Sequence, residues 1–90
     1  MIDKLHRVVT LANGKKYFVL MQTEYQGDSF YLASGVMADG QDLKDDEFAY
    51  LQLRVINGRE YIRVVKDPMT LAILLYRMDP EKYEEKKDTV

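Results

Sequence analysis

The chain has 90 residues, a formal net charge of −2, 47% hydrophobic and 31% charged residues, and no cysteine. This length supports one compact core and is too short for two, so we expect a single soluble globular domain. The composition excludes disulfides and thiolate metal ligands, and the weak negative charge gives no general attraction to nucleic acid or to anionic lipid.

The N-terminal stretch MIDKLHRVV carries charges at Asp3, Lys4 and Arg7 and has no long apolar run. It therefore does not resemble a signal peptide. No apolar segment approaches the roughly 20 residues that cross a bilayer. We expect a cytoplasmic protein with no membrane association, and the absence of cysteine fits a reducing compartment.

The first two predicted strands, 4–12 and 15–25, flank the dipeptide Asn13-Gly14, which favours a two-residue hairpin turn. A strand over 29–38 follows a tight turn at Gly27-Asp28, and Gly35 within it suggests a bulge or a close backbone approach. The only histidine, His6, falls opposite Met21 in this register and is interpreted as structural or exposed.

The first hairpin is apolar on both faces. One face carries Leu5, Val9, Leu11, Phe18 and Leu20, and the other carries Val8, Tyr17, Val19 and Met21. Both faces therefore need cover. A curled sheet and a partner protein are the two alternatives.

Residues 39–46 form the one longer predicted loop. With Glu47, it places five carboxylates, Asp39, Asp42, Asp45, Asp46 and Glu47, beside one lysine. The spacing does not match an EF-hand, so we expect a solvated acidic loop and no metal site.

The last two predicted strands are 47–56 and 59–66. They form a hairpin around Asn57-Gly58, in which residues 48–56 pair with residues 59–66. Counting outward pairs Ile56 with Arg59, Val55 with Glu60, Arg54 with Tyr61 and Leu53 with Ile62. Alternation then gives a core face, consisting of Leu51, Leu53, Val55, Ile62 and Val64, and an opposite face, consisting of Tyr50, Gln52, Arg54, Arg59, Tyr61 and Arg63. Arg54 and Tyr61 are predicted to stack.

A helix is predicted over 68–78, with Asp67 as N-cap and Pro68 at its first position. Leu71, Leu74, Leu75 and Met78 form its apolar stripe, while Met69, Ile73 and Tyr76 lie off that stripe. Residues 1–78 are thus predicted as one α+β domain, a five-stranded antiparallel, twisted or partly rolled meander sheet with a C-terminal helix on one face. Residues 79–90 are predicted as a charged tail, either a short helix or disordered.

Enzymatic chemistry is not predicted. There is one histidine, no cysteine, no phosphate-binding glycine motif and no nucleophile elbow around Ser34. We therefore expect a non-enzymatic protein with no catalytic residue, cofactor or metal.

The segment YFVLMQTEYQGDSFYLASGVM, an acidic spacer and the segment FAYLQLRVINGREYIRVVKDPMTLAILLYRM follow one another in the chain. This order resembles the small YrzB-like bacterial proteins, a family of unknown function, over roughly residues 8–78. The resemblance rests on strand pattern and order. It implies a small, cytoplasmic, non-enzymatic protein of bacterial or phage origin and brings no site residues.

Two functions from different classes are predicted. The first is a protein-interaction module, with a protein partner or a second copy in a homodimer, that uses the apolar residues Tyr17, Met21, Ile73 and Tyr76. The alternative is a weak nucleic-acid-binding domain that uses Tyr50, Arg54, Tyr61 and Arg63, because aromatic and arginine side chains on a sheet hold single strands. An ordinary solvent-facing strand also carries such residues.

Overall fold

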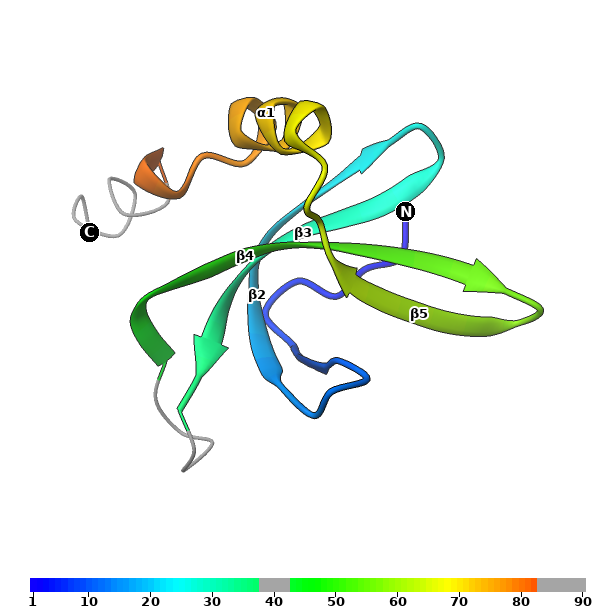
Figure 1. The fold of residues 1–90 in the computed structure, drawn as a ribbon, viewed down its shortest axis with the longest axis horizontal. Coiled ribbons are helices and arrows are strands. Elements are labelled where there is room, and N and C mark those ends of the chain that lie inside the picture. The colour runs from blue at the N-terminus through cyan, green and yellow to red at the C-terminus, as the bar shows by residue number, and fades with distance from the viewer. Residues whose placement is uncertain (38–42, 83–90) are drawn as a thin grey trace.

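The computed structural model describes residues 1–37 and 43–82 (Figure 1). Five strands form one antiparallel sheet in the order β1-β2-β3-β4-β5, and one helix follows. The elements are β1 (Val8–Thr10), β2 (Lys16–Tyr25), β3 (Asp28–Val36), β4 (Leu43–Ile56), β5 (Arg59–Val64) and α1 (Pro68–Arg77). The predicted α+β meander with a C-terminal helix is confirmed.

The β4–β5 hairpin has the predicted register in all four residue pairs. Asn57 and Gly58 have φ values of 53° and 78°, as a type I′ turn requires. The β2–β3 hairpin turns in the same manner at Gln26 and Gly27, with φ values of 52° and 82°. The third predicted turn therefore exists, one residue earlier than expected.

The β1–β2 hairpin differs from its prediction. Val9 pairs with Tyr17 instead of Phe18, and the Leu11 backbone N–H donates to the Lys15 carbonyl at 2.9 Å. The loop thus holds three residues and places Gly14 at φ 87°. A shift of one residue turns every side chain of a strand to its other face. It brings Val9 and Tyr17 onto the same buried face.

β1 is also shorter than the predicted strand 4–12, because the chain turns before it. The Arg7 backbone N–H donates to the Lys4 carbonyl, and His6 has a φ of 60°. The prediction that His6 lies opposite Met21 is wrong, since the His6 ring stacks on Phe18 with centroids 6.1 Å apart.

The two faces of the sheet bury two separate cores. The barrel core lies where the sheet curls over itself, and the helix core lies under α1 (Figure 1). The buried residues of the barrel core are Val9, Leu11, Tyr17, Val19, Tyr31, Ala33, Leu51 and Leu53; those of the helix core are Phe30, Leu32, Val65, Leu74 and Met78. Curling of the sheet therefore covers the face that the helix leaves open.

Helix α1 begins as predicted. The Asp67 side chain accepts a hydrogen bond from the Thr70 backbone N–H at 3.0 Å, and Pro68 occupies the first turn. The Thr70 hydroxyl and N–H lower the pKa of the Asp67 carboxyl. Leu74 and Met78 are buried, but Leu75 is 51% exposed, so its assignment to the buried stripe is wrong.

Gly35 lies at an irregularity of the β3–β4 pairing, as its position in the strand suggested. A Cβ atom at this position would lie 2.9 Å from Cδ of Glu47. The first alternative, a bulge or irregularity of the strand, is therefore met, and the group that lies close to Gly35 is a side chain and not the backbone.

The C-terminal tail begins with a helical turn at residues 80–82. The Glu81 backbone N–H donates to the Asp79 carboxylate at 2.9 Å, which repeats the cap of α1. The remainder of the tail and Asp39 and Asp42 of the acidic loop lie outside the described residues. In the part of the chain that the structure describes, no helix is long and apolar enough to cross a membrane.

Tyr50 connects the sheet to the end of α1, and we expect it to make stability pH-dependent. Its hydroxyl donates to the Met78 carbonyl at 2.7 Å, and burial raises its pKa above the usual value of about 10. Because the folded state binds the phenolic proton more tightly than the unfolded state, this stabilisation is complete below pH 10. It is lost as pH rises through the higher folded pKa.

Tyr50→Phe is expected to lower the free energy of unfolding by about 1 kcal/mol at pH 7 and to flatten its decline above pH 10. Urea unfolding between pH 7 and 11 measures both effects. Tyr61→Phe, at a half-exposed position, is the matched control. If the free energy of unfolding of Tyr50→Phe falls above pH 10 as steeply as that of the wild-type protein, Tyr50 does not have this role.

Candidate functional site

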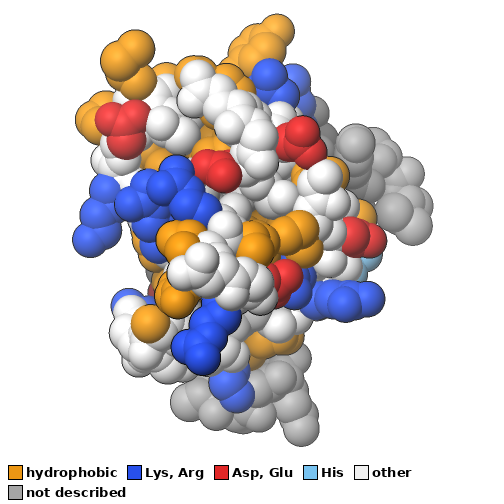
Figure 2. All heavy atoms as spheres, turned by 90° about the vertical axis from the view of Figure 1, so that its right-hand side faces the viewer, with side chains coloured by type: hydrophobic (Ala, Val, Ile, Leu, Met, Phe, Trp, Pro, Cys, Tyr) orange, Lys and Arg blue, Asp and Glu red, His pale blue; other side chains and the backbone are white. Residues whose placement is uncertain are grey.

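The side chains of the β4–β5 hairpin enclose a shallow hollow of about 240 Å³ on the face where Arg54, Tyr61 and Arg63 were predicted. Gln52 and Ile56 complete its lining. Ile56 is 48% exposed and Tyr61 is 51% exposed. Figure 2, which looks toward the hairpin from its tip, shows Lys and Arg side chains beside apolar ones on this side of the molecule. We call this surface the Tyr/Arg face.

Two arginines of the Tyr/Arg face belong to a hydrogen-bonded chain of side chains. Arg63 donates from Nε and Nη2 to Oε1 of the buried Gln52, at 3.1 and 2.9 Å. Gln52 donates in turn to Asp28 at 2.7 Å, and Arg54 reaches the same carboxylate oxygen at 3.3 Å. Asp28 thus neutralises part of the positive charge, and the network holds both guanidinium groups in place.

Tyr50 does not lie on the exposed part of the Tyr/Arg face. It packs against the helix core, and its hydroxyl is bound to the Met78 carbonyl. Its assignment to an open nucleic-acid surface is therefore wrong. The physical reason is that α1 covers the part of the sheet face that Tyr50 occupies, whereas the hairpin extends beyond the helix (Figure 1).

Arg54 and Tyr61 are cross-strand partners, as predicted. The Arg54 guanidinium forms an ion pair with Asp28, while a cation–π contact occurs elsewhere, between Arg77 and the Tyr25 ring at 5.4 Å. The Arg77 contact, together with its hydrogen bond to the Glu24 carbonyl, fixes the last turn of α1 against the β2–β3 hairpin.

Val55 also departs from the prediction for this hairpin. It was expected in the core and is 49% exposed, whereas Leu51 and Leu53 on the same face are buried. The hairpin tip projects past the barrel core, so the last residue of the alternating series has nothing to pack against.

A second candidate surface is the side of α1 that points away from the sheet. Met69 is 77% exposed, Leu75 51% and Tyr76 86%, and Ala72 between them is exposed. We call these four residues the outer face of α1. They include no charged side chain, and the one basic residue of the helix, Arg77, is turned toward Tyr25. Surface helices normally carry polar residues on this side.

The four residues predicted as an apolar interaction surface are not brought together. Tyr17 is buried in the barrel core, so its predicted exposure is wrong. Met21 packs against the helix core, and Ile73 of α1 is half-buried. Tyr76 alone of the four is fully open to solvent. The one-residue register shift of the first hairpin explains the burial of Tyr17.

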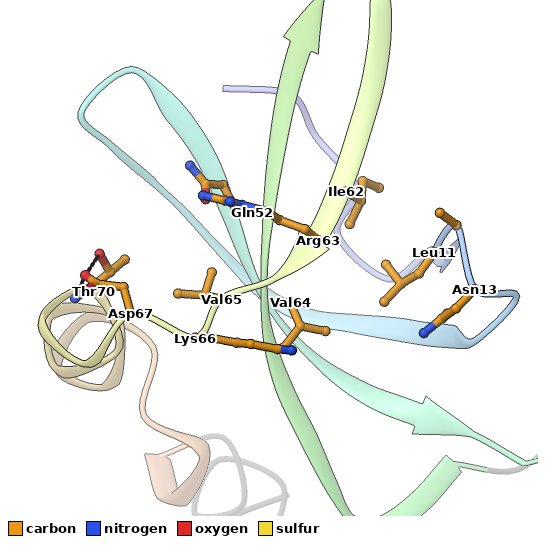
Figure 3. Close-up of a pocket in the computed structure, with 11 residues that line it drawn as sticks. Leu11, Asn13, Gln52, Ile62, Arg63, Val64, Val65, Lys66, Asp67 and Thr70 are labelled. Atoms are coloured by element: carbon orange, nitrogen blue, oxygen red, sulfur yellow. Dashed lines mark hydrogen bonds between the residues drawn. The ribbon is translucent and has the colours of Figure 1, made fainter.

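A third feature is an opening between β1 and β5, the two edge strands of the sheet. Two adjoining hollows, of about 770 and 570 Å³, lie along it and share Leu11, Ala12 and Ile62 in their linings. Figure 3 shows Leu11 and Asn13 across the larger hollow from Ile62 and Val64. We call this opening the seam. An ion pair between Lys4 and Glu60, at 3.0 Å, crosses it.

Metal binding was not predicted. Among the side chains that the structure describes, those of residues 1–37, 43 and 47–82, no group of three or more His, Cys, Asp or Glu is placed to hold a metal ion.

Comparisons with known proteins add no identity to this geometry. No family model, curated protein or solved structure matches the chain. The resemblance to YrzB-like proteins therefore remains a prediction from strand order.

Sequence reasoning missed the Gln52–Asp28 network and the seam. Asp28 lies near Gln52 and Arg54 because Ser29 pairs with Leu53 across β3 and β4. Those strands are joined by a long loop, whose length does not fix the register as a two-residue turn does. The seam depends on how far the sheet curls, and strand alternation contains no information about that.

Proposed function

We propose that this protein is a non-enzymatic protein-interaction module that self-associates through the outer face of α1. The observation that carries the proposal is the exposure of Met69, Leu75 and Tyr76 on a helix with no charge on that side. Contiguous exposed apolar surface is characteristic of protein contacts. A second copy of the chain is a suitable partner for this face. A two-fold axis places the same uncharged surface on both sides of the interface, so like charges do not repel one another there.

The proposal extends to location and origin. The cysteine-free composition supports a cytoplasmic location, and the resemblance of the strand order to that of YrzB-like proteins supports a bacterial or phage origin. The proposed role requires no cofactor and no metal.

Solution mass by light scattering tests the self-association. We expect a dimer that persists when salt is raised to about 0.5 M, because apolar contacts are not screened by ions. Tyr76→Glu places a charge in the proposed interface and is expected to weaken the dimer at least about tenfold.

Tyr61→Glu is the matched control, since it makes the same change at an exposed tyrosine of the Tyr/Arg face. It is expected to leave the mass unchanged. A monomer at every concentration, or equal loss of the dimer in both variants, would contradict self-association through α1.

Nucleic-acid binding by the Tyr/Arg face is the second candidate function. It is favoured by the half-exposed Tyr61 ring beside the arginines that line the same hollow. Asp28 opposes it by pairing with Arg54. Titration with a single-stranded oligonucleotide at rising salt tests it, because phosphate contacts lose affinity steeply as salt is added. Binding that Tyr61→Ala does not weaken excludes stacking on this face.

A further inference from the structure

The seam exposes the free backbone edge of β5. In an antiparallel ladder, successive residues direct their N–H and C=O groups alternately toward and away from the neighbouring strand. The Val65 N–H donates to the Tyr50 carbonyl at 2.8 Å, and the turn pairs Ile56 with Arg59. The odd-numbered residues therefore bond to β4, and the even-numbered Glu60, Ile62 and Val64 direct their backbone groups into the seam.

The opposite border of the seam is the edge of β1. The Leu11 N–H donates to Lys15 and the Arg7 carbonyl accepts from Val19, so Val8 and Thr10 direct their backbone groups outward. In a meander the first and fifth strands run parallel to one another. One added strand that runs antiparallel to β5 would also run antiparallel to β1 and would continue the alternation of the sheet.

The charges along the seam are unbalanced. Its two hollows are lined by four basic residues and two acidic ones, namely Lys4, Arg7, Arg63, Lys66, Glu60 and Asp67, although the whole chain has a net charge of −2. Lys4 and Glu60 form an ion pair with each other, which leaves three basic residues against Asp67, so the seam keeps a net positive charge. Arg7 and Lys66 are exposed. The complementary ligand is therefore acidic.

The geometry points to a binding site for an extended, acidic peptide segment of another protein, which adds as a sixth strand along β5 and lies in the seam. Backbone hydrogen bonds to Glu60, Ile62 and Val64 hold the strand, as in other cases of strand addition. Glutamate or aspartate side chains of the peptide face the basic residues that border the seam.

A second copy of this chain is a poorer occupant of the same edge. Two-fold pairing of β5 with β5 of a second copy joins two basic edges and places Arg59 and Arg63 of both copies on one face of the joined sheet. The site is separate from the outer face of α1, so the self-association proposed above neither requires it nor excludes it.

Binding of a fluorescently labelled peptide, measured by anisotropy, tests the site. The probe alternates glutamate with valine and threonine, and its control carries lysine in place of glutamate. We expect the acidic peptide to bind and the lysine peptide not to bind. No binding of the acidic peptide up to millimolar protein, or equal binding of both peptides, overturns the proposal.

Two variants of Glu60 distinguish the contribution of its backbone N–H to peptide binding from the contribution of its charge. Glu60→Ala keeps the outward N–H and removes a negative charge, so it is expected to bind the acidic peptide equally well or more tightly. Glu60→Pro removes the same charge and also the N–H, which β4 does not use. We expect Glu60→Pro to bind about tenfold more weakly than Glu60→Ala. Equal binding by two folded variants overturns the strand addition.

Lys66→Glu tests the charge and provides a second measurement if the proline variant does not fold. It reverses one charge at the seam. We expect it to weaken binding of the acidic peptide at least about fivefold in low salt, and by a smaller factor in high salt. Lys82→Glu makes the same change at an exposed lysine outside the seam linings and is expected to leave binding unchanged. Equal weakening by both variants overturns the assignment.

Discussion

Leu74→Ala is expected to lower the free energy of unfolding by about 2–5 kcal/mol, the usual cost of truncating a fully buried leucine. Leu74 is 0% exposed and packs in the helix core. Its loss leaves a cavity between α1 and the sheet, where the neighbouring Met78 is also fixed by the contact of its carbonyl with Tyr50. For a domain of this size, such a loss is a large part of the total stability.

Leu75→Ala is the matched control, because it makes the same change at the next residue, where the side chain is 51% exposed. It is expected to change the free energy of unfolding by less than about 0.5 kcal/mol. Urea unfolding followed by circular dichroism, at one low protein concentration, compares the two variants. Equal losses would mean that α1 packs with a different rotation about its axis.

Val19→Ala is expected to lower the free energy of unfolding by about 2–3 kcal/mol, because Val19 is 0% exposed in the barrel core. Val8 lies in the same hairpin and is 51% exposed, so Val8→Ala is expected to lower the free energy of unfolding by less than about 1 kcal/mol. Both variants lose the same atoms from a β-strand, so the difference between them measures burial.

This pair also tests the register of the first hairpin. With a two-residue turn at Asn13-Gly14, Val8 would lie opposite Val19 on one face, and the two substitutions would have similar costs. In the structure, Val8 pairs with Phe18 and Val19 pairs with Ala33. Similar losses in the two variants would therefore support the two-residue turn.

The contrast between the two Asn-Gly hairpins shows how far turn chemistry determines register. At Asn57-Gly58 the dipeptide adopts the type I′ turn that it favours, and every predicted pair follows. At Asn13-Gly14 the loop gains a residue. That register places Val9 and Leu11 in the barrel core with Tyr17. We attribute the choice to burial, because core formation outweighs the preference of a dipeptide for one turn.

Helix α1 shows a similar limit. Asp67 and Pro68 fixed its beginning from the sequence, because capping depends on adjacent residues. The sequence did not determine the rotation of α1 about its axis, which decides the side of the helix that faces the sheet. Apolar residues occur on all sides of the helix, so periodicity alone did not distinguish the buried Leu74 from the exposed Leu75.

The candidate surfaces were predicted less completely than the fold. Alternation placed Arg54, Tyr61 and Arg63 on one face of the β4–β5 hairpin, and the structure brings them around one hollow. It did not show that α1 covers Tyr50 or that Asp28 reaches Arg54 across the sheet. Both facts depend on contacts between elements that are distant in the chain.

The sequence by itself determined the order of the strands, the β4–β5 register, the beginning of α1 and the alternation of faces within each strand. These features depend on turns, caps and side-chain periods that act over a few residues. Only the tertiary structure decided the register of β1, the burial of Tyr17, the partial burial of Tyr50 under α1, the exposure of Leu75, and the open seam between β1 and β5. These features depend on which apolar surfaces exclude water together, and that is a property of the whole chain.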